Sequence, residues 1–401
     1  MLRVPVQKIE SGMVLARPIP MHDDPFRYLL QRDREIPLDL VPRLVQMGVS
    51  EVWVRCRTLE FLEDLIDEGL EERQRNVYHL VRRNFEQIMD NPTANLDFSQ
   101  FQSCIAELFQ YLRRNNAGNK LLQKLVAFDN YLLTHCTNVC YLALLLGMKL
   151  ERYLIKERSF KTARDAKDLQ ELGLGCLLHD VGKMRIPLEL LNKPTRLTDD
   201  EMRLIEQHTI FGHEMVRNRI PAGAANIVLN HHQRYNGQGY PRRKHHATNE
   251  PMAPLAGKAI PVFSRIATVC DVYDAATSRR PYSPAKLPVQ VLHEMRTWCK
   301  GYFDPIPEHA FYQIIPPFPI GQIVELTNGV EAVVVDFQPE HPTRPKVQGL
   351  RDPHGQRYRD PALEEIDLAI YSDLSIVGIN GIDVRPYLAS QESAELAGLY
   401  A

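Results

Sequence analysis

The spacing of apolar residues changes twice along the chain. Residues 1–57 alternate short β-prone runs, such as VLARPIP and EVWV, with the amphipathic stretch IPLDLVPRLVQMGV, and this alternation predicts a small αβ unit. From residue 58 to about 315, apolar residues recur at helical spacing in stretches such as VYHLVRRNFEQIM and FQSCIAELFQYLRR. The sequence therefore predicts a mainly α chain with a large helical middle.

A third pattern follows the run PPFP at residues 316–319. The stretch IGQIVELTNGVEAVVVDF alternates apolar and polar residues around the pair Asn328-Gly329, a strong signal for a β-hairpin. The stretch KVQGLRDPHGQRYR suggests a second hairpin. We therefore expect a small β unit at the C-terminal end, followed by a loosely structured tail from residue 385 to 401.

Composition narrows the class of protein. The chain has 401 residues, 44% of them hydrophobic and 24% charged, and its formal net charge is -2. A chain with so little net charge has no overall attraction to a polyanion, so we expect no nucleic acid polymer as a partner. The one dense basic run, at residues 242–246, is interpreted as a solvated loop.

Cysteine usage and apolar runs indicate a cytoplasmic protein without a membrane span. The seven cysteines are widely spaced and form no CxxC pair, which argues against a disulfide framework or a thiolate zinc site. The N-terminal residues lack the pattern of a secretion signal. The longest apolar stretch, near residues 139–150, is too short to cross a bilayer.

The motif LLHDVGK offers the first candidate chemistry. In this motif, His179 and Asp180 stand side by side at the end of an apolar stretch, and Gly182 and Lys183 follow them. An imidazole and a carboxylate can bind one metal together, and the carboxylate can bridge to a second ion. Taken alone, such a pair at a helix end is more often a capped or solvated feature.

Other histidines and an aspartate occur in or beside apolar helical stretches. They are His135, His208, His231, His232 and Asp271. Burying such groups is costly, and metal coordination is a common way of relieving that cost. The whole set therefore favours a shared metal centre over unrelated core or surface histidines.

The ordered motifs HDVGK, HTxxG, HHQRxNGQGYP and DVYDAxTSRRPY resemble the HD-GYP family, a branch of the HD-domain metal-dependent phosphohydrolases. The opening and closing stretches also look like units that accompany such domains. The resemblance implies a mainly α fold, in which an all-α HD-type catalytic domain stands between a small N-terminal αβ unit and a small C-terminal β unit. The expected divisions are an αβ unit at 1–57, a helical lead-in or signalling segment at 58–124, the catalytic domain at 125–315, the β unit at 316–384 and the tail at 385–401.

The resemblance also implies two divalent metal ions. One would be bound by His135, His179, Asp180 and Asp271, and the other by His208, His231 and His232, with Asp180 bridging both. Imidazole and carboxylate ligands without thiolate suit iron or manganese. A hydroxide held between the ions would then be the nucleophile.

The family pattern assigns further roles around the metals. Asp180 and Lys183 are the expected catalytic residues, with Lys183 placing positive charge on a phosphate oxygen. Lys183, Tyr240 and Arg280 are the expected substrate contacts. Gly239 and Pro241 are expected to shape the loop, Asp274 is either a partner of a ligand or a plain helix residue, and His213, His245 and His246 match no ligand position.

Four positions depart from the family pattern. Tyr131 stands where some members have a glutamate that binds a third metal, so two ions are expected. Gln233 and Asn236 replace a usual glutamate and aspartate, and Ser283 stands where a basic residue is common. Substrate affinity is the property that these changes affect first.

The implied reaction is hydrolysis of cyclic di-GMP, a bacterial second messenger governing biofilm and motility, to linear pGpG, with either pGpG or GMP as the end product. One alternative is the same chemistry on another cyclic dinucleotide or a mononucleotide. Another is a catalytically weak protein that binds the nucleotide and signals to a partner. The N-terminal region is the expected place for a homodimer contact or a signalling partner.

Overall fold

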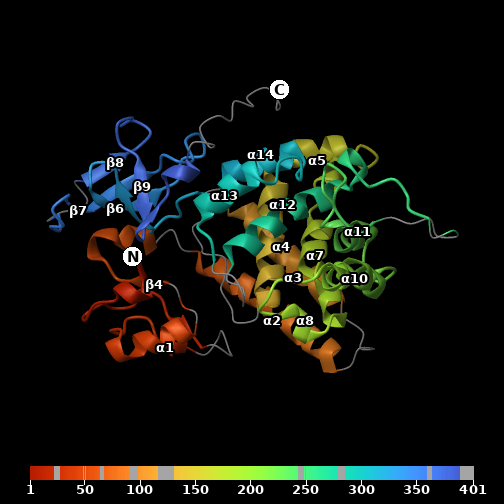
Figure 1. Cartoon of the computed structure of the whole chain (residues 1–401), viewed down its shortest axis with the longest axis horizontal. Helices are drawn as coiled ribbons and strands as arrows, with labels where there is room; N and C mark the ends of the chain where they lie inside the picture. The colour runs from red at the N-terminus through yellow and green to blue at the C-terminus, as the bar shows by residue number, and fades with distance from the viewer. Residues whose placement is uncertain are drawn as a thin grey trace. The chain divides into compact units, whose positions relative to one another are not determined.

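The computed structural model describes most of the chain as two compact units (Figure 1). One unit combines Met1–Asp67, Leu287–His293 and Ile315–Ala401, and the other combines Glu68–Lys286 and Glu294–Ile314. The predicted divisions at residues 57, 124, 315 and 384 stay predictions. The residues described are 1–21, 28–47, 49, 51–63, 67–90, 98–115, 131–242, 248, 250–278, 285–358 and 364–388.

The larger unit is helical, which confirms the predicted mainly α fold class. Its helices are α2 (Glu68–Asp90), α3 (Phe98–Arg114), α4 (Tyr131–Lys149), α5 (Glu151–Glu157), α6 (Ala163–Ala166), α7 (Gln170–Leu178), η5 (Val181–Arg185), α8 (Leu188–Leu191), α9 (Asp199–Glu206), α10 (His208–Val216), α11 (Ala222–Asn230), η6 (Gly257–Ala259), α12 (Val262–Thr277) and α14 (Pro305–Ile314). Helix α13 (Pro288–Thr297) has residues in both units.

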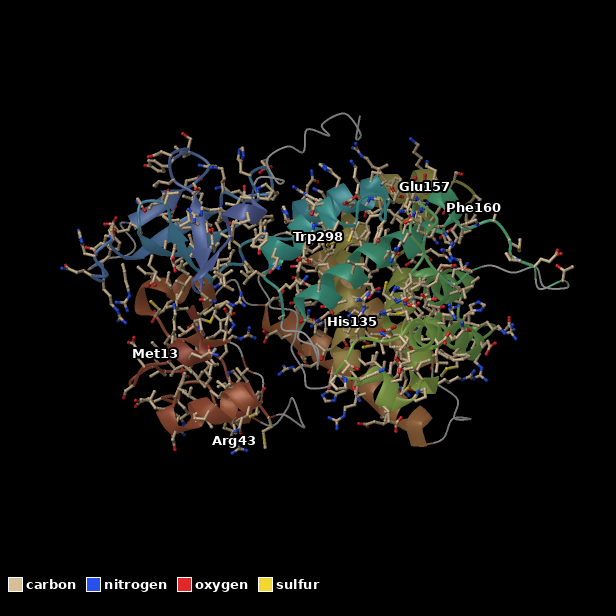
Figure 2. The ribbon with its side chains drawn as sticks, viewed as in Figure 1. Met13, Arg43, His135, Glu157, Phe160 and Trp298 are labelled. Carbon is tan, nitrogen blue, oxygen red and sulfur yellow. The ribbon has the colours of Figure 1, made fainter. Side chains whose placement is uncertain are left out.

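Helix α4 lies at the centre of the helical unit. It packs against α7 and α12, and α7 in turn packs against α11. Its residues 139–146 are buried on every face, which explains why the stretch is apolar throughout rather than striped. In Figure 2, His135 of α4 (2% exposed) lies inside this unit, whereas Phe160 (83% exposed) lies at its surface.

Among the described residues, one helical window is long and apolar enough to cross a membrane. This window, Leu132–Lys149 of α4, begins earlier than the apolar stretch recognised in the sequence, and 83% of it is buried inside the helical unit. Such burial is the pattern of a core helix.

A glycine allows η5 to lie directly against α10. A Cβ atom added at Gly182 would stand 1.9 Å from the carbonyl oxygen of His208 and 2.4 Å from the amide nitrogen of Gly212. Backbone atoms cannot move aside as a flexible side chain can, so only glycine fits at this position. The turn after His179-Asp180 is thereby held against the helix that carries His208.

The N-terminal part of the other unit is a small αβ structure. Strands β1 (Leu2–Pro5) and β4 (Glu51–Val54) pair antiparallel, as do β2 (Ile19–Pro20) and β3 (Tyr28–Leu30). Its helical elements are η1 (Val6–Lys8), η2 (Leu38–Leu40), α1 (Val41–Gln46) and η3 (Arg57–Glu63). Leu15, Ile36 and Leu44 belong to its buried core, so the apolar runs recognised in the sequence are what fold it.

The C-terminal part is a six-stranded antiparallel sheet in the order β10-β9-β5-β6-β7-β8. Its strands are β5 (Ile323–Leu326), β6 (Glu331–Asp336), β7 (Lys346–Arg351), β8 (Glu365–Asp367), β9 (Ile376–Ile379) and β10 (Ile382–Asp383). The predicted hairpin is β5–β6, and Gly329 turns it with φ +82. At the second predicted hairpin, a bridge between Arg351 and Arg357 returns along β7, and the Tyr358 backbone amide donates a hydrogen bond to the Leu350 carbonyl oxygen. The predicted tail begins with η8 (Arg385–Tyr387), and residues 389–401 lie outside the described part.

Candidate metal centre

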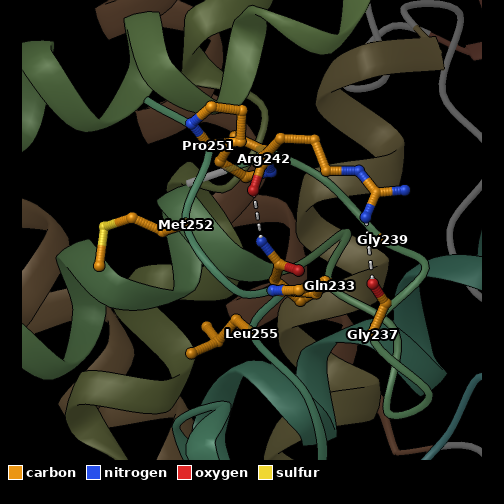
Figure 3. Close-up of a pocket in the computed structure, with 9 residues that line it drawn as sticks. Gln233, Gly237, Gly239, Arg242, Pro251, Met252 and Leu255 are labelled. Carbon is orange, nitrogen blue, oxygen red and sulfur yellow. Dashed lines mark hydrogen bonds between the residues drawn. The ribbon is translucent and has the colours of Figure 1, made fainter. Parts of the chain in front are cut away.

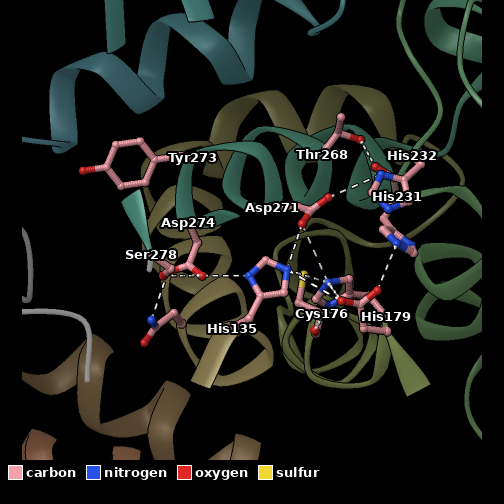
Figure 4. Close-up of polar contacts among 12 residues, drawn as sticks. His135, Cys176, His179, His231, His232, Thr268, Asp271, Tyr273, Asp274 and Ser278 are labelled. Atoms are coloured by element: carbon pink, nitrogen blue, oxygen red, sulfur yellow. Dashed lines mark hydrogen bonds and ion pairs between the residues drawn. The ribbon is translucent and has the colours of Figure 1, made fainter. Parts of the chain in front are cut away.

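The seven expected metal ligands come from helices and helix ends that are far apart in the sequence, and their side chains meet in the helical unit (Figure 4). His135 lies in α4 and Asp271 in α12, whereas His208 begins α10. The other four follow the ends of α7 and α11: His179, Asp180, His231 and His232.

One group of possible ligands is His135, His179 and Asp180, all buried. The Nε2 atoms of the two histidines are 3.3 Å apart. Oδ2 of Asp180 lies 3.7 Å from Nε2 of His135 and 3.4 Å from Nε2 of His179. Three donor atoms therefore face a common point.

The second group is Asp180, His208, His231 and His232. Its contacts with the carboxylate use the other oxygen: Oδ1 of Asp180 lies 3.3 Å from Nε2 of His208 and 3.9 Å from Nε2 of His231. The Nε2 atoms of His208 and His231 are 3.3 Å apart. Asp180 is thus shared by both groups through different oxygens.

The Oδ1 atom of Asp180 provides a test of whether the residues suit a cation. This atom is buried and has no hydrogen-bond partner among the described residues. A buried carboxylate oxygen left in this way is costly unless a positive charge faces it. Together with the surrounding imidazole nitrogens, it has the donor chemistry of a divalent metal site.

Asp271 lies at the edge of the first group. Its Oδ1 atom is 3.0 Å from Nε2 of His135 and 3.8 Å from Nε2 of His179, and its Oδ2 atom is 3.5 Å from Nδ1 of His232. The carboxylate therefore reaches ligands of both groups, although it is not a member of either close set.

The buried rings are oriented by acceptors at Nδ1. Nδ1 of His179 lies 2.6 Å from the carbonyl oxygen of Cys176. Nδ1 of His208 lies 2.7 Å from the carbonyl oxygen of Ile205. An acceptor at Nδ1 fixes the proton there and leaves Nε2 as the lone-pair atom toward the centre. Helix ends supply free carbonyl groups for this purpose, which explains why ligands follow helices in this fold.

Burial keeps the second group of rings neutral. It lowers the pKa of His208 to about 4 and that of His232 to about 3, and it lowers the pKa of His231 well below its usual value. Neutral imidazole is the form that binds metals. For His135, burial also acts to lower the pKa, but hydrogen bonds to Asp271 and Asp274 outweigh it and raise the pKa to about 9.

Lys183 reaches the shared carboxylate. Its Nζ atom lies 2.6 Å from Oδ2 of Asp180, and 20% of its side chain is exposed. Burial acts to lower the pKa of Lys183, but the charge of Asp180 outweighs it and the pKa is raised. A fixed positive charge therefore stands at the border between the centre and solvent.

Tyr240 covers one side of the centre. Its ring centroid lies 4.6 Å from that of His232 and 6.2 Å from that of His208. Gly239 before it touches the backbone so closely that a Cβ atom would lie 2.4 Å from the His232 carbonyl oxygen. The loop is thereby pressed against the residue that carries a candidate ligand.

The two family departures in this loop have structural contacts. Gln233 is buried and its side-chain amide donates a hydrogen bond to the Pro241 carbonyl oxygen at 2.8 Å (Figure 3). A cavity of about 300 Å³ lies here, with Gln233, Gly239 and Pro241 in its wall. The side-chain oxygen of Asn236 accepts a hydrogen bond from the backbone amide of Gln238, so Asn236 helps to hold the turn.

Several expected residues lie outside the centre or outside the described part. His213 is half-buried and belongs to neither ligand group. Arg280, Ser283, His245 and His246 lie outside the described residues. Tyr131 begins α4.

Asp274 is the residue whose role the sequence left open. It accepts from Nδ1 of His135 at 2.7 Å and from Asn138 at 2.9 Å. The spacing of Asp271 and Asp274 on one helix was a usable signal, because residues three apart are neighbours on a helix surface. The position of the His135 ring between them was not visible in the sequence.

The fold and these contacts define a class, a helical domain in which two adjoining groups of histidines and carboxylates could hold metal ions. Residues 120–306 match the HD domain, and residues 323–381 match the KOW domain associated with the HD domain. The HD domain and the relatives described below support the resemblance of this chain to the HD-GYP family.

Three curated relatives are named as phosphodiesterases. A cyclic di-GMP phosphodiesterase of Pseudomonas aeruginosa is 34% identical over 239 residues, 59% of this chain and 52% of that protein. A cyclic di-GMP phosphodiesterase of Thermotoga maritima is 26% identical over 285 residues, 69% of this chain and 68% of that protein. A 3'3'-cGAMP-specific phosphodiesterase of Vibrio cholerae is 32% identical over 131 residues, 32% of this chain and 23% of that protein. The chain therefore spans about half the length of the first of them.

Proposed function

We propose that the protein is a metal-dependent phosphodiesterase that hydrolyses cyclic di-GMP to pGpG, with either pGpG or GMP as the end product. The observation that carries this proposal is the Asp180 carboxylate, whose two oxygens face two different groups of histidines. Two relatives named as cyclic di-GMP phosphodiesterases support the choice of substrate.

The centre is proposed to hold two divalent ions, iron or manganese. His135, His179, Asp180 and Asp271 would bind one ion, and His208, His231, His232 and Asp180 the other. Such ions, when bound, supply Lewis acidity toward the phosphodiester and lower the pKa of a water molecule. The neutral rings of His208, His231 and His232 suit this role without first losing a proton.

Other side chains are proposed to handle the substrate. Lys183 places a positive charge beside Asp180, where a non-bridging phosphate oxygen could be stabilised. Tyr240 lies on His232 and offers an aromatic face at the same border. Arg280 is proposed as a further contact, since a guanidinium fork suits phosphate or a guanine edge.

Another cyclic dinucleotide is the second candidate substrate. The relative from Vibrio cholerae that is named as specific for 3'3'-cGAMP supports it. The metal ligands govern the reaction, whereas the surrounding pocket selects the base, so the same centre suits either substrate. A catalytically weak nucleotide sensor is the third candidate, supported by Gln233, Asn236 and Ser283, which all depart from the family pattern.

The remaining proposals concern the cell and the other domains. We propose a cytoplasmic protein, consistent with cysteines that are all free. The N-terminal region and the helices from 58 to 124 are proposed to carry a signalling partner or a homodimer contact. The five-part division of the chain is retained as a proposal, with the KOW-like β unit following the HD domain.

Substrate competition separates the candidates. Full-length protein loaded anaerobically with Fe²⁺ or Mn²⁺ is given cyclic di-GMP or 3'3'-cGAMP, and products are separated by chromatography. Faster turnover of cyclic di-GMP, with pGpG as the first product, is the expected result. Preferred turnover of 3'3'-cGAMP would transfer the assignment to that substrate, and tight binding without turnover by metal-loaded protein would favour the sensor.

A further inference from the structure

The His135 ring lies between two carboxylates of helix α12. Its Nε2 atom is 3.0 Å from Oδ1 of Asp271, and its Nδ1 atom is 2.7 Å from Oδ2 of Asp274 (Figure 4). The two aspartates are three residues apart, so they project from neighbouring positions on the helix. Helix α12 therefore holds the ring at both of its nitrogens.

Asp274 is itself fixed in place. Its side chain is fully buried, and it accepts hydrogen bonds from Asn138 at Oδ1 (2.9 Å) and from Ser278 at Oδ2 (3.3 Å). Asn138 comes from the same helix as His135. The carboxylate therefore acts on a metal through His135 and is not a ligand of its own.

The other well-oriented rings have neutral partners at Nδ1. Nδ1 of His179 lies near the carbonyl oxygen of Cys176, and Nδ1 of His208 lies near that of Ile205. Nδ1 of His231 lies near two backbone carbonyl oxygens. A carboxylate partner withdraws the Nδ1 proton more strongly than a carbonyl does, and so makes Nε2 a stronger donor to a metal. Among these four rings, His135 alone has that partner.

The fixed charges add to the difference between the two positions. Asp180 serves both positions, whereas Asp271 and Asp274 lie against His135. The ammonium group of Lys183 offsets one negative charge at Oδ2 of Asp180, and two carboxylates remain on that side. The position facing His208 and His231 has three imidazole rings and the shared carboxylate. Asp271 also approaches this position, but its oxygen lies farther from His232 (3.5 Å) than its other oxygen lies from His135 (3.0 Å). A divalent cation is therefore attracted more strongly to the His135 side.

We propose that Asp274 is a positioning residue that makes the His135 position the tighter of the two metal sites, so that it fills first. This inference rests on the proposed two-metal function and gives its two ions an order. The His208 position is then the one whose occupancy follows the free metal concentration. Turnover, which needs both ions, would depend on that weaker site.

Metal titration of four proteins tests the order. Metal-free wild type, Asp274→Asn, His135→Ala and His208→Ala are titrated with Mn²⁺ alone and followed by calorimetry. Wild type should bind two ions in separate steps. Asp274→Asn should weaken the tighter step by about 10- to 100-fold and leave the weaker step within a few-fold. His135→Ala should affect the same step as Asp274→Asn, and His208→Ala the other.

The matched control is Ser278→Ala, which removes a weaker contact of Asp274 and keeps its bond to His135. Both Mn²⁺-binding steps of this variant should keep their wild-type affinities. The inference is overturned if Asp274→Asn weakens the step that His208→Ala weakens, weakens both alike, or changes neither. Wild type that binds no Mn²⁺ would instead overturn the two-metal function.

A measurement on unaltered protein covers the case in which Asp274→Asn does not fold. Wild-type crystals grown with one equivalent of Mn²⁺ should give an anomalous peak beside His135 and His179. A peak beside His208 and His231, or two peaks of equal height, would contradict the proposed order.

Discussion

The Nζ atom of Lys183 lies 2.6 Å from Oδ2 of Asp180, the carboxylate that both groups of histidines share. Under the proposed function, this lysine would meet a negatively charged phosphate that approaches the centre. Its charge is maintained because Asp180 raises its pKa more than burial lowers it.

Lys183→Met is expected to separate metal binding from turnover. Loss of one preorganised donor to a developing negative charge typically slows an enzyme about 100- to 1,000-fold. The variant should keep its metal content, or bind metal more tightly, because a positive charge beside the site is gone. Steady-state kinetics and elemental analysis measure both properties. Lys183→Arg is the matched variant and should retain more activity, and unchanged kcat in Lys183→Met would remove the residue from the mechanism.

Gln233→Glu restores the residue type common in the family, and we expect it to harm this chain. A carboxylate cannot donate to the Pro241 carbonyl oxygen, and a buried acceptor left unpaired costs about 1–3 kcal/mol. The loop carrying Tyr240 should loosen, so KM for cyclic di-GMP should rise more than kcat falls. Gln233→Met, of similar shape without a donor, should behave alike. A lower KM in Gln233→Glu would show that the acidic residue serves the substrate here too.

Gly182→Ala should disturb the contact between η5 and α10. The added methyl group would overlap the His208 carbonyl, which belongs to backbone and cannot rotate away. We expect loss of at least one metal ion and a lower melting temperature. Gly223→Ala is the control, since its methyl group would meet the tip of the Glu171 side chain, which can move. Equal melting temperatures for the two variants would argue against the tight contact.

Acid should weaken a second polar cluster of the helical unit. Burial alone would raise the pKa of Glu157, but hydrogen bonds from Lys258 and Arg265 outweigh it and lower the pKa below its ordinary 4.5. Because the folded pKa is the lower one, this contribution to stability is complete above about pH 4.5 and is lost as pH falls through the folded pKa. Melting temperatures of wild type and Glu157→Gln should therefore converge below that pH. A constant difference between the two proteins down to pH 3 would contradict this role.

The fold class was predictable because each part of the chain has its own periodicity. Helical spacing identified the central unit, and Asn328-Gly329 identified the β5–β6 hairpin. The domain divisions were harder to predict. Residues 287–293 and 315–401 group with the N-terminal residues in one compact unit, and such contacts between distant segments leave no mark on local spacing.

The ligand candidates were predictable from motifs, whereas their surroundings were not. His135 lies in a stretch that reads as an ordinary apolar helix, and its partners Asp271 and Asp274 follow more than 130 residues later. The bond between Gln233 and Pro241 likewise depends on how the loop closes. Residue types suggested the chemistry, but the hydrogen bonds at Nδ1 that aim each ring required the packed helices.

Metal content and turnover of Asp180→Ala, measured on the same anaerobic preparation, test the bridging carboxylate most directly. Wild type should contain about two iron or manganese ions per chain, as expected for a two-metal site, and should hydrolyse cyclic di-GMP. The variant should lose both properties, because each group of histidines loses its shared oxygen ligand. Retention of both ions and of full turnover by Asp180→Ala would show that this carboxylate does not join two metal sites.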